Sequence, residues 1–147
     1  MAEIVLQLGT NLGDRKANLA RALELLDNAL GPYESISQVI ETEAVGFSGP
    51  AFLNCAVRYR TRKRPLTVLG ICKDIEYAMG RRETMEFAPD GSRIFHDRII
   101  DIDILVWQTA SGPLEMHTEK LTLPHPQVEE RPFVKPLMEQ VLTKEPR

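Results

Sequence analysis

Two aspartates spaced one residue apart, Asp101 and Asp103, are the pair in the sequence best suited to chemistry. They fall in an apolar, β-branched run from Ile99 to Trp107 that predicts a strand. Alternate side chains of a strand share a face, so the two carboxylates lie side by side while the flanking isoleucines enter the core. At about 5 Å and an effective dielectric of about 20, their charges repel by roughly 3 kcal/mol. Either a divalent cation such as Mg²⁺ balances them, or they form a solvated strand face beside Arg98.

Arginines bracket this pair in the sequence: Arg81, Arg82, Arg93, Arg98 and Arg131. A guanidinium group binds phosphate oxygens through two parallel hydrogen bonds, so arginines beside a metal site suit phosphoryl chemistry. Taken singly, each arginine is more typical of a solvated surface. We assign the basic run 58–64 to that surface class.

Four other residues allow both a functional and a structural interpretation. His125 lies between two prolines, which either present its ring stiffly to a ligand or pack it in a loop. Glu76 lies near the end of a predicted helix and points either into a site or into water. Phe52 and Phe133 are either core residues or two rings that hold a flat heterocycle between them.

The composition restricts the class of protein. A chain of 147 residues with 43% hydrophobic and 27% charged residues fits one globular domain, residues 1–147. The net charge of -3 gives no general attraction for nucleic acid. Cys55 and Cys72 have apolar neighbours and no CxxC spacing, which indicates buried, reduced thiols in a cytoplasmic protein. No stretch approaches the roughly 18 apolar residues of a membrane span, so we expect no membrane association.

Periodicity predicts the elements that position these residues. Strands are expected at 3–9, 33–42, 52–61 and 99–107, and helices at about 15–30, at about 65–80 and within 128–141. Asp14 is expected to cap the first helix after a tight turn. The second helix is expected to carry Leu66, Leu69, Ile75 and Met79 inward.

The order strand, helix, strand, strand, helix, strand predicts an α+β fold of the split β-α-β type. In such a fold an antiparallel sheet carries the helices on one face and leaves the other face open for a site. Segments 44–51 and 81–98 do not fit regular structure, and loops of this length are usually functional or mobile.

Taken together, the motifs resemble the 6-hydroxymethyl-7,8-dihydropterin pyrophosphokinases of folate biosynthesis. The likeness rests on 8–14, on 41–46 with 52–54, on 75–81 with 98–104, and on 123–126 with 131–133. The resemblance implies a monomeric, ferredoxin-like enzyme that transfers pyrophosphate from ATP to the pterin hydroxymethyl group and releases AMP. It also implies two Mg²⁺ ions on Asp101 and Asp103.

The resemblance further implies which residues bind each substrate. The pterin residues are Thr42, Val45, Phe52, Asn54 and Phe133, with the ring between the two phenylalanines. The ATP residues are Glu76, Arg81, Arg98, His125 and Arg131, of which Arg81 and Arg98 are also catalytic. Residues 82–97 would form a lid over ATP. Glu83, Phe95 and Asp97 depart from the family's lid pattern, which affects the expected lid contacts.

Two other classes of protein are weighed against the enzyme. A small-ligand regulatory module can use the same sheet without catalysis, but it has no need for two adjacent carboxylates. An RNA-binding sheet would expose aromatic side chains and a basic face where this strand has Asp101 and Asp103. The aspartate pair therefore favours the enzyme.

Overall fold

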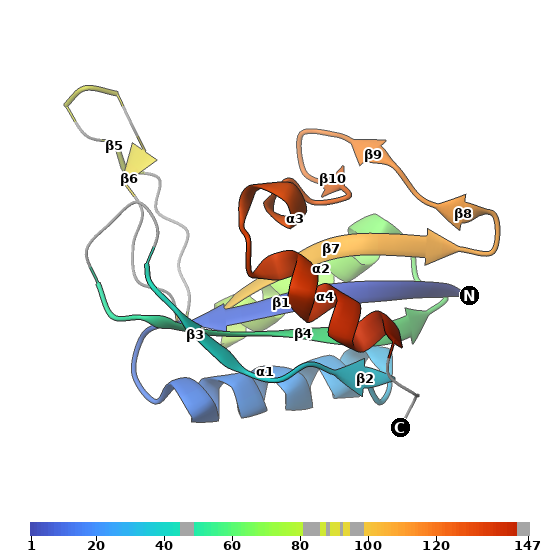
Figure 1. Ribbon diagram of the computed structural model, residues 1–147, viewed down its shortest axis with the longest axis horizontal. Helices are drawn as coiled ribbons and strands as arrows, with labels where there is room; N and C mark the ends of the chain where they lie inside the picture. The colour runs from blue at the N-terminus through green and yellow to red at the C-terminus, as the bar shows by residue number, and fades with distance from the viewer. Residues whose placement is uncertain (45–48, 81–85, 88, 92, 95–98, 144–147) are drawn as a thin grey trace.

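The computed structural model describes residues 1–44, 49–80, 86–87, 89–91, 93–94 and 99–143. An antiparallel sheet of long and short strands forms its centre (Figure 1). The central strand β1 (Ala2–Thr10) pairs with β4 (Phe52–Thr61) on one side and β7 (Asp101–Thr109) on the other. Short strands β2 (Ser35–Ile36) and β3 (Ile40–Thr42) pair with β4, and β8 (Gly112–Pro113) pairs with β7. This arrangement confirms the predicted α+β fold with an antiparallel sheet.

Two long helices, α1 (Arg15–Leu30) and α2 (Pro65–Ala78), pack on one face of the sheet. The Asp14 side chain caps α1 by accepting a hydrogen bond from the Ala17 N–H at 3.1 Å, as predicted. The core between sheet and helices contains Leu6 and Leu8 of β1, Leu26 of α1 and Cys72 of α2, among others. Both cysteines are free and buried, as expected.

The second face of the sheet has a covered end and an uncovered end, the latter being the part over which no helix of the described residues packs. At the covered end, α3 (Gln127–Glu130) and α4 (Val134–Thr143) pack on β1, β4 and β7 (Figure 1). Leu137 and Val141 there belong to one apolar cluster with Val5 and Leu105. The C-terminal helix, predicted without a position, therefore covers one end of the face that we expected to be open.

The predicted strand 33–42 is two strands rather than one, because Ser37 interrupts the backbone ladder. Its Oγ accepts the Ala56 N–H at 2.8 Å and donates to the Gln38 carbonyl at 2.8 Å. A side chain thus takes a place that a backbone carbonyl would fill in a continuous strand.

Two predicted exposures are wrong. Arg58, assigned to the surface, is only 6% exposed, because α4 ends over it and Arg58 donates to the Leu142 carbonyl at 3.4 Å. Leu66, expected in the core, is 51% exposed, because it lies in the first turn of α2 while Val68 and Cys72 face the sheet.

Part of the predicted lid 82–97 is described. Strand β5 (Glu86–Phe87) pairs with β6 (Arg93–Ile94), and this ribbon stands apart from the main sheet (Figure 1). The short strands β9 (Met116–His117) and β10 (Thr122–Leu123) form a second small ribbon.

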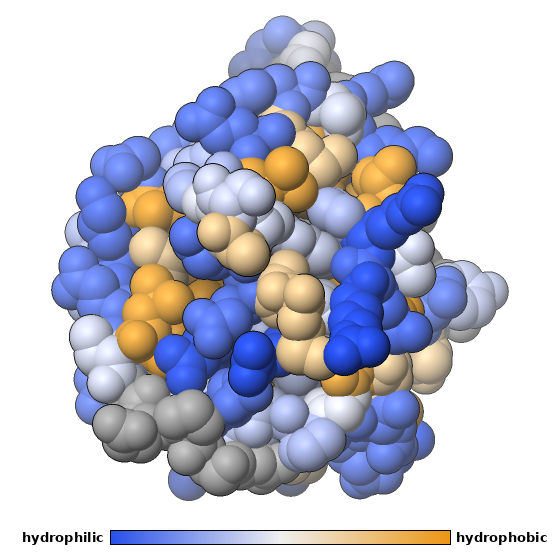
Figure 2. Space-filling model, turned by 90° about the vertical axis from the view of Figure 1, so that its right-hand side faces the viewer, coloured by the Kyte–Doolittle hydropathy of each residue, from blue (hydrophilic) through white to orange (hydrophobic). Residues whose placement is uncertain are grey.

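Among the described residues, none of the helices combines the length and apolarity needed to cross a membrane. On the end of the molecule seen in Figure 2, hydrophobic residues form small groups separated by hydrophilic ones, as is usual for a globular surface.

Candidate active site

Asp101 and Asp103 lie half-buried on the uncovered end of the sheet's second face. In the register of β1 and β7, Asp101 is opposite Gly9 and Asp103 is opposite Gln7. The isoleucine between them, Ile102, is buried in the opposite face. The shared face of the two carboxylates, predicted from their spacing, is therefore present.

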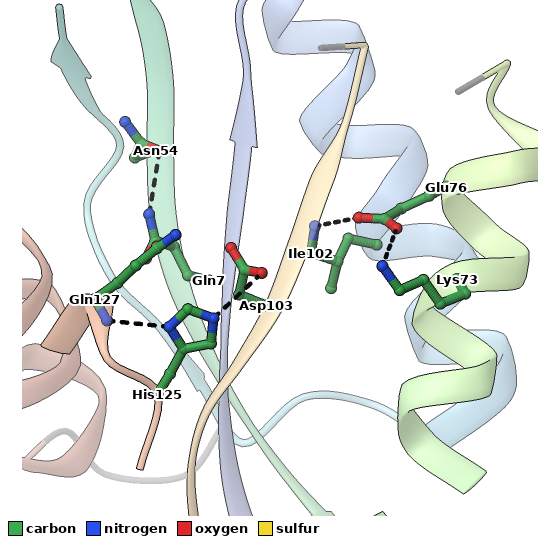
Figure 3. Close-up of polar contacts among 8 residues, drawn as sticks. All are labelled: Gln7, Asn54, Lys73, Glu76, Ile102, Asp103, His125 and Gln127. Atoms are coloured by element: carbon green, nitrogen blue, oxygen red, sulfur yellow. Dashed lines mark hydrogen bonds and ion pairs between the residues drawn. The ribbon is translucent and has the colours of Figure 1, made fainter. Parts of the chain in front are cut away.

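Glu76 of α2 holds the backbone between the two aspartates. Its Oε2 accepts a hydrogen bond from the Ile102 N–H at 2.8 Å, and its Oε1 lies 3.9 Å from Lys73 Nζ (Figure 3). The side chain is 4% exposed, so the interpretation that it points into water is wrong. Among the described residues, no strand pairs with this edge of β7 at Ile102, and the buried Glu76 carboxylate accepts the N–H in place of a strand carbonyl.

His125 is held against β7 by backbone contacts. Its N–H donates to the Leu105 carbonyl at 2.8 Å, next to the point where the β1–β7 register shifts. The His125 ring Nδ1 accepts the Gln127 N–H at 3.1 Å, while Nε2 lies 3.7 Å from Asp103 Oδ1 (Figure 3). The histidine thus belongs to the same site as the aspartate.

Burial lowers the pKa of His125 below its ordinary value, and the charge of Arg131 lowers it further, while Asp101 and Glu130 act in the opposite direction. The lowered pKa favours the neutral form of the ring at pH 7. Because Nδ1 accepts a hydrogen bond, the single ring proton is on Nε2, facing Asp103. His125 can thus donate one N–H to an anionic group without adding charge.

A second polar group lies on β3 and β4, across β1 from the aspartates. Asn54 is buried, and its Nδ2 donates to Thr42 Oγ1 at 2.6 Å. The Phe52 side chain lies over Gly9, since a Cβ at Gly9 would be 3.6 Å from Phe52 Cδ1.

Hydrogen bonds from Asn11 to the Pro50 carbonyl and from Arg15 to the Ala51 carbonyl hold the chain that enters β4.

The other predicted residues fall into two groups. Phe133 packs on the cluster beneath α4 with Ile40, and Arg131 is near enough for its charge to act on His125. Val45, Arg81 and Arg98 lie outside the described residues, as do Glu83, Phe95 and Asp97.

A cavity of about 330 Å³ opens beside Asp103 and His125, between α2 and the segment 120–126. Its wall is apolar at Leu69 and Ile104, and Lys73 and Lys120 add two amines. Neither lysine was singled out in the sequence, although Lys73 lies three residues before Glu76 and so shares its side of the helix.

The donor set fits Mg²⁺ better than a metal bound by protein alone. In the described parts of the chain, no group of three or more His, Cys, Asp or Glu side chains could hold a metal ion. Two carboxylates on one face suffice for Mg²⁺, which commonly completes its shell with water and substrate phosphates.

Comparison with known proteins decides the family. Residues 5–142 match the model of the family described as 7,8-dihydro-6-hydroxymethylpterin-pyrophosphokinase (HPPK). The chain belongs to the HPPK family. A 2-amino-4-hydroxy-6-hydroxymethyldihydropteridine pyrophosphokinase of Porphyromonas gingivalis is 39% identical over 136 residues, covering 92% of this chain and 87% of that protein. The Aquifex aeolicus protein of the same name is 37% identical over 141 residues, covering 95% and 80%.

A larger relative carries a matching segment. The folate synthesis bifunctional protein of Arabidopsis thaliana is 36% identical over 134 residues, which are 90% of this chain and 25% of that protein. The HPPK resemblance drawn from the motifs is thereby confirmed.

Proposed function

We propose that this chain transfers a pyrophosphoryl group from ATP to 6-hydroxymethyl-7,8-dihydropterin and releases AMP. The observation that supports it most directly is the position of Asp101 and Asp103, between the Asn54 and Thr42 group and the cavity beside His125. Membership of the HPPK family supplies the reaction class. Two substrates that bind on either side of the aspartates would meet over them.

The cavity suits the nucleotide. Apolar side chains on its wall can cover a heterocycle, while Lys73, Lys120 and the Nε2–H of His125 can bind phosphate or hydroxyl oxygens. Glu76 acts here by holding β7 at Ile102, and its predicted direct contact with ATP stays a prediction. Arg81, Arg98 and Arg131 would add charge-assisted hydrogen bonds to the phosphates.

The Asn54 group suits the pterin. Asn54 and Thr42 offer an amide and a hydroxyl to the polar edge of the ring, and Phe52 lies beside them to stack on its face. Phe133 would take the other face, and the backbone at Val45 would complete the edge.

Asp101 and Asp103 would hold Mg²⁺, two ions as the resemblance implies, which when bound neutralise phosphate charge during transfer. The pterin hydroxyl oxygen forms a bond to the β-phosphorus, the bond from that phosphorus to the α–β bridging oxygen breaks, and AMP leaves with that oxygen. The hydroxyl proton is released to water. The chain contributes alignment and water exclusion, with the lid 82–97 closing over ATP.

An AMP-release assay tests this proposal. With ATP, Mg²⁺ and hydroxymethyldihydropterin, the wild type should form AMP, and omission of either pterin or Mg²⁺ should abolish it. Asp101→Asn and Asp103→Asn should lower turnover at least about 100-fold, because each removes a carboxylate that would hold the Mg²⁺ needed to neutralise the phosphates. Glu115→Gln, on an exposed carboxylate, is the matched control and should change little. Full turnover by the Asp101→Asn/Asp103→Asn double variant would refute the proposal.

A further inference from the structure

Gln7 is a polar residue in an otherwise aliphatic stretch of the central strand. It is 4% exposed and lies on the same face as the aspartates, with Asp103 as its partner on β7 and Ala56 as its partner on β4. Neither a metal role nor a substrate contact has been assigned to it.

Gln7 is hydrogen-bonded to the residue that we assign to the pterin. Its Nε2 donates to Asn54 Oδ1 at 3.3 Å, and Asn54 Nδ2 in turn donates to Thr42 Oγ1 at 2.6 Å (Figure 3 shows the first bond). The Thr42 hydroxyl can either donate or accept, so it leaves both orientations of the Asn54 amide open. The Gln7 amide is placed with its amino group toward Asn54, and in this orientation its N–H keeps the Asn54 oxygen on its own side.

The same glutamine is unfavourable for the fold. Its Oε1 is buried and has no hydrogen-bond partner among the described residues. A buried, unpaired acceptor destabilises a protein, and an apolar side chain of similar length at this position would not carry one. Local rules are most often broken in this way at functional sites.

We propose that Gln7 is a positioning residue for pterin recognition: it orients the Asn54 amide so that the second N–H of Nδ2 faces an acceptor on the ring. This inference rests on the proposed function, because it takes Asn54 as a pterin contact. Gln7 acts through Asn54, since its own Oε1 is buried away from the surface.

Calorimetric titration of four proteins tests the inference: the wild type, Gln7→Met, Asn54→Ala and the double variant. The titrant is 6-hydroxymethyl-7,8-dihydropterin in the presence of Mg²⁺ and a non-hydrolysable ATP analogue. Gln7→Met should weaken pterin binding about tenfold and leave binding of the analogue unchanged. In the Asn54→Ala background the same change should have no further effect, because the amide through which it acts is gone.

The control is Gln140→Met on α4, which also removes a side-chain hydrogen bond, to the Gln38 N–H, but lies on the covered end of the sheet. It should leave the pterin affinity unchanged. Gln7→Met should melt near the wild-type temperature, because it removes the unpaired Gln7 Oε1 but also takes the Gln7 donor away from Asn54 Oδ1.

The outcomes separate the two proposals. A wild type that does not bind the pterin would refute both. Pterin binding that is equal in the wild type and Gln7→Met, or additive losses in the double variant, would overturn the role of Gln7 alone. A Gln7→Met protein that fails to fold would show that the amide serves the fold, and would overturn it as well.

Discussion

At the scale of single residues, Gly9 leaves the space that the Asn54 side chain occupies. The two residues are partners on β1 and β4, and a Cβ at position 9 would lie 2.8 Å from Asn54 Oδ1. That distance is too short for a stable contact, so any larger residue would push the amide out of its place beside Gln7. The sequence interpretation placed Gly9 at the end of a strand before a turn, whereas the strand continues through it to Thr10.

Gly9→Ala is therefore expected to weaken pterin binding at least about tenfold, since it displaces the recognition amide while leaving the nucleotide cavity intact. Calorimetry with the pterin and, separately, with an ATP analogue measures the two affinities. Gly70→Ala is a matched control on α2, where an added Cβ meets nothing within 4 Å. The control should raise the free energy of unfolding by about 0.5–1 kcal/mol, because alanine favours a helix. Equal losses of both ligands in Gly9→Ala would contradict this explanation.

The chemistry of single residues was predictable where it depended on spacing alone. The shared face of Asp101 and Asp103 follows from the period of two of any strand. The roles of Gln7 and Gly9 depend on which residues of β4 lie opposite them, and register between distant strands cannot be read from a local pattern. The one local signal for Gln7 was a glutamine within the run EIVLQLG.

At the scale of elements, Glu76 joins α2 to β7 through the Ile102 N–H. Glu76→Leu should lower the free energy of unfolding by about 1–3 kcal/mol, because it leaves a buried N–H unpaired. Glu76→Gln keeps an acceptor oxygen and should lose clearly less. Urea titration measures both variants. If Gln and Leu destabilise equally, the hydrogen bond to Ile102 is not what Glu76 contributes.

Element boundaries were predictable where periodicity and caps agreed. Asp14 and Gly31 delimit α1, and the run from Phe52 to Thr61 is strand β4 as expected. The position of α4 was not predictable, because its apolar stripe shows that it packs but not on which surface. The burial of Arg58 follows from that placement, and so its surface assignment failed with it.

At the scale of the whole molecule, the two buried cysteines, Cys55 and Cys72, can be used to measure the stability of the core between the sheet and the helices. Cys55 lies on β4 and Cys72 on α2, in one cluster of buried residues. Burial raises the pKa of the Cys55 thiol from 9.0 to about 12. Burial also raises the pKa of Cys72 to about 12, with a smaller contribution from the charge of Glu76. Both thiols are therefore protonated and unreactive in the folded protein.

We expect both cysteines to react with a disulfide reagent at pH 8 only through global unfolding, because both thiols are buried in the same hydrophobic cluster. The free energy of opening obtained from each labelling rate should then equal the value from urea titration. Between pH 9 and 12 the unfolded chain loses thiol protons that the folded chain keeps. The free energy of unfolding should therefore fall by up to about 1.4 kcal/mol per pH unit for each thiol, and this loss should become negligible below about pH 8. Faster labelling of Cys72 than of Cys55 would instead mean that α2 detaches from the sheet independently, and the Glu76 contact that holds the site would open with it.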